Sequence, residues 1–192
     1  MSALLRAYNS ALIRRPYATG AASAAVLFGT GDILAQQGIE KRGSNHDYLR
    51  TLRLAGYGGL VFAPIVTRVY GGLERIVFQS KVATTAARVA VDQLLLTPVM
   101  LTVFFTTQSL LEMKGFGEAK RRMQSSWWPT LKTNWSVWAP VQVANFSIVP
   151  AHLRLLTVNV VSLFWNAYLS YANAQAGPGK EPAVKEALGT AA

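Results

Sequence analysis

Five apolar stretches, each about long enough to cross a bilayer, constrain what this chain can fold into. A helix needs about 20 predominantly apolar residues to span the hydrocarbon core of a membrane. The stretches cover residues 17–37, 52–73, 89–111, 128–149 and 153–171. Only 15% of the residues are charged, against about 25% in an ordinary soluble domain. We therefore predict an all-α fold, a multi-pass integral membrane helix bundle with four or five spanning helices.

The number of spans depends on the last two stretches, which Pro150 separates. They form either two spans, or one span followed by a partly interfacial helix. On this reading the chain has an N-terminal amphipathic or targeting segment, a membrane helix bundle and a flexible tail, at residues 1–16, 17–173 and 174–192.

The basic residues indicate contact with a membrane surface. The net charge is +10, and the cations lie at the ends of the apolar stretches, at Arg14, Arg15, Arg50, Arg53, Arg88 and Lys120 to Arg122. Cations in such places anchor helices against anionic headgroups. No nucleic-acid-binding motif accompanies them, so we expect no direct nucleic acid binding. The first acidic residue is Asp32, and this basic, acid-poor start fits either mitochondrial targeting or a plain membrane anchor.

Tryptophans mark the start of the fourth stretch. Trp127, Trp128 and Trp135 lie where basic residues give way to apolar ones. An indole ring prefers the membrane interface, with its body in the acyl boundary and its N–H among the headgroups. We therefore expect these rings at headgroup level.

Enzyme signatures are missing from the sequence. The chain has no cysteine, which excludes a thiolate nucleophile or a cysteine metal site. It has neither a P-loop nor a dinucleotide-binding fingerprint. His46 and His152 are far apart, and neither has a carboxylate at helical ligand spacing. We expect no enzymatic activity, no cofactor and no metal site.

Small residues recur at every fourth position in the first two apolar stretches. Such a stripe lets two helix backbones approach closely. The first stripe is Ala21, Ala25 and Gly29, and the second is Ala55, Gly59 and Ala63. The matching spacing predicts that the two helices pack as a pair, and the alternative is ordinary alanine richness.

Polar residues inside or at the edge of the apolar stretches are the candidates for function. A charge at the bilayer centre costs about 2.5–3.5 kcal/mol, so it faces the bundle interior or a water-filled cavity. One reading is a polar path for solutes, and the other is interhelical bonding worth about 0.6 kcal/mol per contact. The candidates are Asp32, Asp92, Gln93, Asn145 and Arg154.

A known family shares a series of residues with this chain between about residues 15 and 171. Towards the C-terminus they are Asn134-Trp135, Val137-Trp138, Gln142, Asn145-Phe146, Val149-Pro150, Arg154, Asn159, Trp165-Asn166 and Tyr168-Leu169-Ser170. Earlier ones are Pro16, Thr19, Gly31-Asp32, Gln36, Asp47, Arg50, Arg53, Pro64, Tyr70, Asp92-Gln93 and Pro98. The chain thereby resembles the small membrane proteins named for a peroxisomal membrane protein and for a mitochondrial inner-membrane protein whose loss depletes mitochondrial DNA. The family usually has Trp followed directly by Pro, whereas Ala139 intervenes here.

The resemblance is nearest to the fungal mitochondrial stress-response branch of that family. It implies a mitochondrial inner-membrane protein that supports stress response, metabolite homeostasis and mitochondrial DNA maintenance through a weakly selective channel. The alternatives are a non-conducting scaffold or complex organiser, and a peroxisomal membrane channel. The expected partners are the lipid bilayer, small-molecule solutes or ions, and a second copy of the chain or a larger membrane complex.

Overall fold

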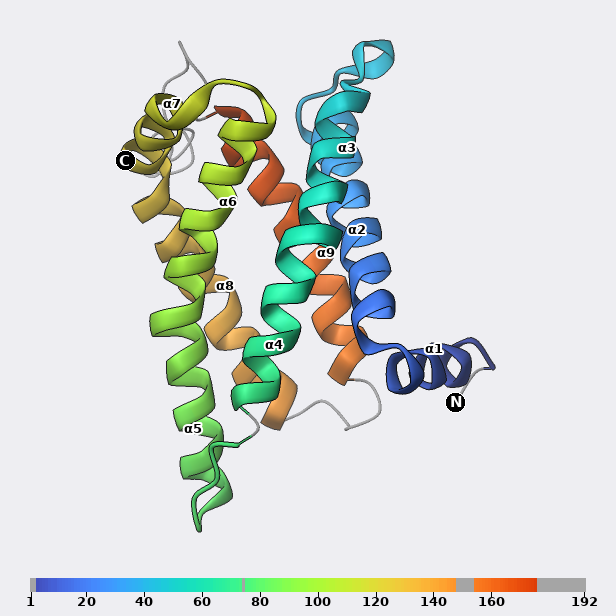
Figure 1. The fold of residues 1–192 in the computed structure, drawn as a ribbon, viewed down its shortest axis with the longest axis vertical. Coiled ribbons are helices and arrows are strands. Elements are labelled where there is room, and N and C mark those ends of the chain that lie inside the picture. The colour runs from blue at the N-terminus through green and yellow to red at the C-terminus, as the bar shows by residue number, and fades with distance from the viewer. Residues whose placement is uncertain (1–2, 74, 148–153, 176–192) are drawn as a thin grey trace.

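Every element in the described part of the chain is helical (Figure 1). The computed structural model describes residues 3–73, 75–147 and 154–175. The α-helices are α1 (Ala3–Arg14), α2 (Pro16–Leu34), α3 (Tyr48–Gly56), α4 (Ala63–Leu73), α5 (Lys81–Val91), α6 (Thr97–Leu111), α7 (Gly115–Arg122), α8 (Trp128–Ser147) and α9 (Arg154–Gln175). The prediction of an all-α fold is confirmed for these residues.

Short π-helical turns continue or join several of these helices into longer rods. They are Ala35–Ile39, Tyr57–Phe62, Asp92–Leu96 and Met123–Trp127, and a 3₁₀ turn covers Gly43–Asn45. The rods run side by side, whereas α1 lies crosswise to them beside the start of α2, far from α7 (Figure 1).

Three prolines follow π-turns at the same distance. Pro64, Pro98 and Pro129 each lie two residues after the last residue of such a turn. A proline inside an α-helix has no N–H to donate, and its ring clashes with the carbonyl four residues earlier. The wider turn shifts the bonding by one residue, so that the N–H of Thr97 donates to the carbonyl of Asp92. The helices can therefore pass these prolines without ending.

Two helices begin earlier than the apolar stretches suggest. α5 starts at Lys81, because the hydroxyl of Ser80 caps it by accepting a hydrogen bond from the N–H of Ala83 (3.4 Å). Asp47 caps α3 in the same way, so this helix begins before the second apolar stretch, at Tyr48 instead of residue 52.

The basic segment before the fourth stretch is also helical. α7 packs against α6 and continues through a π-turn into α8. α8 then runs through Pro140 without a break. The last described helix, α9, includes residues 174 and 175, the first two residues of the tail that the sequence predicts to be flexible. The remainder of that tail lies outside the described residues.

The two small-residue stripes lie where α2 packs against α3 and the π-turn that follows it. A Cβ placed on Gly29 would lie 3.4 Å from the Cβ of Ala55. A Cβ placed on Gly59 would lie 3.1 Å from the carbonyl oxygen of Ala21 and 3.3 Å from the Cβ of Ala25. The backbones of these two rods are thus close enough that small side chains fill the space between them.

α2 approaches α9 even more closely on its other side. A Cβ on Gly31 would lie 2.6 Å from the Cβ of Asn166 and 2.9 Å from the backbone nitrogen of Ala167. Only glycine fits a contact with backbone atoms at that distance. Ala63, the last residue of the second stripe, is buried as well.

Apolar side chains occupy both the inside and the outside of the bundle. Phe104 and Phe105 lie in the core, whereas Leu60 is 81% exposed and Phe164 is 65% exposed. Two of the described helical segments are long and apolar enough to cross a membrane, Pro16–Ile39 and Lys81–Leu111. Of the most apolar 18 residues in each segment, only 33% and 28% are buried. Core helices of soluble proteins are mostly buried, so these two segments differ from them.

Candidate functional site

A buried carboxylate, Asp32, joins α2, α3 and α9 near one end of the bundle. Its Oδ1 accepts a hydrogen bond from the hydroxyl of Ser170 (2.5 Å) and lies 2.8 Å from Nε of Arg50. Its Oδ2 accepts hydrogen bonds from the amide of Gln36 (2.7 Å) and the hydroxyl of Thr51 (2.5 Å). A carboxylate offers about four lone-pair sites, and here all four are used within the protein.

Arg50 supplies the positive charge beside Asp32. Its guanidinium also forks onto Glu40, with Nη1–Oε2 and Nη2–Oε1 distances of 3.0 and 2.7 Å. Burial by itself raises the pKa of Glu40, but the hydrogen bonds and charge of Arg50, and then those of Arg42, outweigh it and hold the pKa below 4.5. We call this set the Asp32 cluster: Asp32, Gln36, Glu40, Arg50, Thr51 and Ser170.

A second buried arginine, Arg122, lies between α6, α7 and α9. It forks onto Glu112, and its Nε donates to Oε1 of Glu118 (3.0 Å). Its Nη1 also donates to Oδ1 of Asn173 (3.0 Å). The hydrogen bond from Arg121, reinforced by Arg122, lowers the pKa of Glu118 to about 2. We call this set the Arg122 cluster: Glu112, Glu118, Arg122 and Asn173.

Both clusters bind the last turns of α9 at the same end of the bundle, where α3 and α7 also lie (Figure 1). Ser170 and Asn173 are three residues apart and therefore neighbours on one face of that helix. The expectation that Arg50 and Arg122 reach lipid headgroups is wrong, because both side chains are buried and bonded to carboxylates. Charge and hydrogen bonds thus close this end of the bundle.

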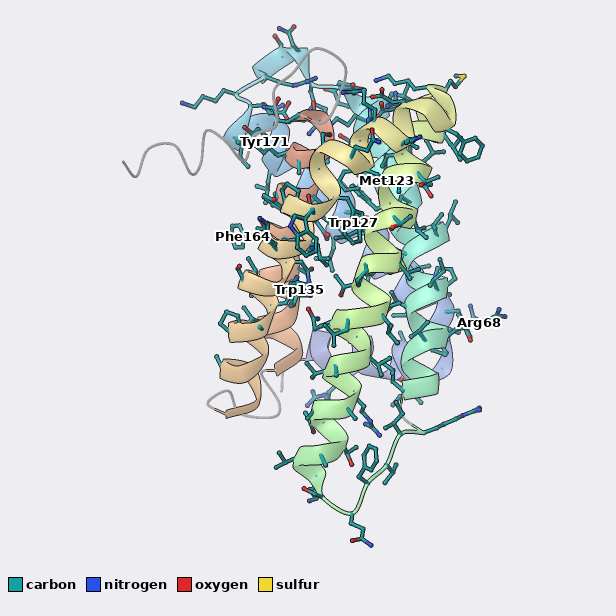
Figure 2. All side chains as sticks on the ribbon, turned by 90° about the vertical axis from the view of Figure 1, so that its left-hand side faces the viewer. Arg68, Met123, Trp127, Trp135, Phe164 and Tyr171 are labelled. Carbon is teal, nitrogen blue, oxygen red and sulfur yellow. The ribbon has the colours of Figure 1, made fainter. Side chains whose placement is uncertain are left out.

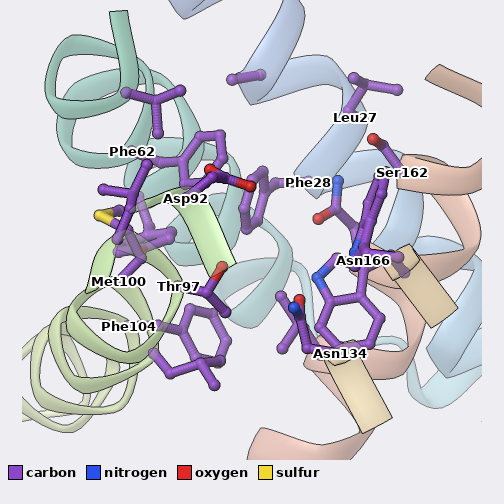
Figure 3. Close-up of a pocket in the computed structure, with 18 of the residues that line it drawn as sticks. Leu27, Phe28, Phe62, Asp92, Thr97, Met100, Phe104, Asn134, Ser162 and Asn166 are labelled. Carbon is purple, nitrogen blue, oxygen red and sulfur yellow. The ribbon is translucent and has the colours of Figure 1, made fainter. Parts of the chain in front are cut away.

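Beside the closed end the bundle has a partly open cavity of about 390 Å³ (Figure 3). One wall is a continuous row of aromatic rings in the order Phe62, Phe28, Tyr57 and Phe104. Successive ring centroids lie 5.3, 5.5 and 5.2 Å apart. Leu169 also lines the cavity, next to Ser170 of the Asp32 cluster. A space of this size, mostly apolar with a few polar groups, is typical of a site for one small molecule.

The polar groups of the cavity form a hydrogen-bonded series that ends on a carboxylate. The amide of Asn134 donates to Oε1 of Gln93 (3.1 Å), and Nε2 of Gln93 donates to Oδ2 of Asp92 (2.7 Å). All three residues line the cavity, and so does Asn166 (Figure 3). The orientation of each amide is fixed by its neighbour, so that a donor points at Asp92.

Two tryptophans hold the helices around this series together (Figure 2). Nε1 of Trp135 donates to the carbonyl of Gln93 (3.1 Å). In the π-turn register this carbonyl would pair with the N–H of residue 98, and Pro98 has none. Nε1 of Trp127 donates to Thr102 Oγ1 (3.1 Å). The expectation that these two N–H groups reach the headgroups is wrong, because they bond to the neighbouring rod.

The N-terminal helix contributes to the cavity as well. The hydroxyl of Tyr8 on α1 lies 3.0 Å from that of Ser23 on α2, and both residues line the cavity. α1 is therefore more than a targeting segment in this fold, since it forms part of the cavity wall.

Comparison with known proteins decides the family. A model of the Mpv17 / PMP22 family matches residues 109–170. Protein SYM1 of Gibberella zeae is 47% identical over 178 residues, which cover 91% of this chain and 100% of the relative. The chain belongs to the Mpv17 / PMP22 family.

Other Mpv17 / PMP22 relatives are similarly well covered. Protein SYM1 of Saccharomyces cerevisiae is 43% identical over 179 residues, which cover 90% of this chain and 91% of the relative. Protein SYM1 of Mycosarcoma maydis is 49% identical over 152 residues, which cover 79% and 76%. No solved structure matches the chain significantly. The resemblance seen in the sequence is confirmed, including its fungal branch, and the chain is a membrane protein of this family.

The structure separates the candidate polar residues instead of gathering them. Asp32 lies in the closed end, whereas Asp92 and Gln93 line the cavity. Asn145 and Arg154 lie on α8 and α9, and their side chains are outside the part that the structure describes. Among the described residues, no group of three His, Cys, Asp or Glu side chains could hold a metal ion.

Sequence reasoning missed the partners that make the site. Asn173 lies outside the residues shared with the family, and Glu112 and Arg122 read as polar residues at the end of an apolar stretch. Arg50 and Asn134 do belong to the shared residues, so their presence in that set was the available signal. Nothing in the local pattern says which carboxylate each arginine meets.

Proposed function

We propose that this protein is a mitochondrial inner-membrane protein with four or five spanning helices that encloses a weakly selective pathway for small solutes. Through this pathway it would support stress response, metabolite homeostasis and maintenance of mitochondrial DNA. Family membership supports the membrane setting. The two long apolar segments Pro16–Ile39 and Lys81–Leu111 support spanning helices. The basic N-terminal segment supports the mitochondrial compartment.

The observation that carries the proposal is the cavity between the rods. Its polar series of Asp92, Gln93 and Asn134 comes from two different rods and faces a space large enough for a small molecule. Ionisable groups inside a membrane bundle are rare, face its interior or a water-filled cavity, and are candidates for solute paths by default. The closed end beyond Ser170 fits a resting state of such a pathway.

A non-conducting scaffold is the competing function. The two arginine clusters favour it, because they hold α9 through Ser170 and Asn173 and pair each buried arginine with carboxylates. A scaffold of this kind would organise the membrane or a larger complex, as a homo-oligomer or with other proteins. It would show no conductance.

The experiment compares purified wild-type protein with Asp92→Asn and Asp92→Glu in planar bilayers. A fixed negative charge near a pathway attracts cations and repels anions. We expect the wild type to conduct with a weak preference for cations. In Asp92→Asn the reversal potential should shift in the direction of greater anion permeability, and in Asp92→Glu it should shift little. Unfolding of each variant in detergent is measured alongside, so that a lost fold is recognised.

Absence of any wild-type conductance, with normal folding, would leave the scaffold as the function.

The compartment is tested separately with a C-terminally tagged chain. It should remain with the inner membrane after the outer mitochondrial membrane is ruptured, whereas co-purification with peroxisomes would place the pathway there.

A further inference from the structure

The chemistry of the cavity wall points to a particular class of ligand. We propose that the cavity binds a small organic ammonium ion, with the cation held between the carboxylate of Asp92 and the rings of Phe28 and Phe62. This inference names the solute class of the pathway proposed above and rests on the same cavity. It concerns binding, however, which can be measured whether or not the protein conducts.

The aromatic row is the first observation behind this proposal. Phe62 and Phe28 come from the π-turn after α3 and from α2, and their ring centroids lie 5.3 Å apart. The face of such a ring attracts a cation within about 6 Å of the ring centroid, by about 2 kcal/mol or more when the cation is desolvated. Trp138 and Trp165 extend the aromatic lining to α8 and α9. A methylated or alkylated ammonium gains from these rings, whereas a phosphate does not.

The polar series supplies the second observation. The amide oxygen of Gln93 is occupied by Asn134, so its NH₂ is directed at Asp92. One oxygen of a carboxylate accepts more than one hydrogen bond, so an ammonium ion can join the contacts that Asp92 already makes. Figure 3 shows Asp92, Phe28 and Phe62 pointing into the same cavity from three segments of the chain.

The distribution of positive charge is the third observation. The sequence holds 19 lysines and arginines, yet among the described residues that line the cavity none is a lysine or an arginine. Arg50 and Arg122 are bonded to carboxylates in the two clusters. The described lining therefore offers an anion no cationic partner and presents a carboxylate instead.

The test uses three probes of one shape in calorimetry on the purified, detergent-solubilised protein. They are choline, its neutral carbon isostere dimethylbutanol, and the corresponding anion dimethylbutanoate. We expect choline to bind about tenfold more tightly than the alcohol, which corresponds to about 1.4 kcal/mol from ring and carboxylate together. The carboxylate probe should bind more weakly than either.

Three variants assign that preference to Asp92 and Phe62. Asp92→Asn should remove most of the advantage of choline over the alcohol, and Asp92→Glu should keep much of it. Phe62→Leu preserves the charge and should weaken choline several-fold while changing alcohol binding little. If Asp92→Asn does not fold, Phe62→Leu alone decides.

Equal binding of choline and the alcohol by the wild type, or tighter binding of the anion, overturns the proposal. So does a choline preference that neither Asp92→Asn nor Phe62→Leu reduces. Choline binding without conductance would instead keep the site and refute the pathway, and conductance without a choline preference would do the reverse. The two proposals therefore fail in distinguishable ways.

Discussion

Replacing Arg50 by methionine tests whether the Asp32 cluster holds the closed end together. Methionine keeps much of the side-chain volume but removes the charge and every hydrogen bond of the guanidinium. Asp32, which has no exposed surface, and Glu40 would then lack their buried cation. Breaking a buried pair by removing one partner typically costs about 3–5 kcal/mol, because an uncompensated charge remains. We expect a loss of that size in the free energy of unfolding.

Arg42→Met is the matched control, since Arg42 pairs with the same Glu40 but its side chain is 32% exposed. Such partly solvated pairs contribute about 0–1 kcal/mol. A further variant combines Arg50→Met with Asp32→Asn and Glu40→Gln, which removes the stranded charges. It should recover much of the lost stability, because the neutral amide at position 32 can still bond to Ser170 and Thr51.

The assay is reversible unfolding in mixed micelles, followed by the fluorescence of the five tryptophans. If Arg50→Met costs no more than Arg42→Met, the cluster does not hold the bundle closed. If the combined variant is less stable than Arg50→Met alone, the loss comes from the missing guanidinium contacts and not from stranded charge.

Two other predictions concern packing and pH. Gly31→Ala places a Cβ 2.6 Å from that of Asn166 and should destabilise the fold by about 1–3 kcal/mol. In the control Gly56→Ala the new Cβ meets nothing within 4 Å, so this change should stabilise the fold by about 0.5–1 kcal/mol. Equal effects of the two changes in the same unfolding assay would contradict the close contact of α2 with α9. Burial raises the pKa of Glu112, but Arg122 and Lys114 outweigh it, so that the pKa values of Glu112 and Glu40 both lie below 4.5 in the folded protein. Their contribution to stability is therefore complete above pH 4.5 and is lost as the pH falls below it. On acidification the melting temperature should therefore drop mainly below pH 4.5. A drop that occurs mainly at higher pH would refute the assignment.

The sequence by itself determined the class of this protein. Long apolar stretches and a low share of charged residues predict helices in a membrane. In lipid, a helix satisfies the hydrogen bonds of its own backbone N–H and C=O groups and presents apolar side chains to the surroundings. The spacing of Gly29 and Gly59 within small-residue stripes indicated two helices that can approach closely, and these glycines do face Ala55 and Ala25. The shared residues also identified the family.

Only the tertiary structure decided which charges are inside and what they meet. Arg50 looked like a lipid anchor, yet it contacts Ser170, a residue 120 positions away. Trp135 looked like an interface marker, yet it satisfies a carbonyl that Pro98 leaves without its helical partner. Such pairings depend on how the rods pack, since residues brought together from distant segments leave no local periodicity in the sequence. The cavity has the same origin, because its aromatic row and its polar series belong to rods that meet only in the folded bundle.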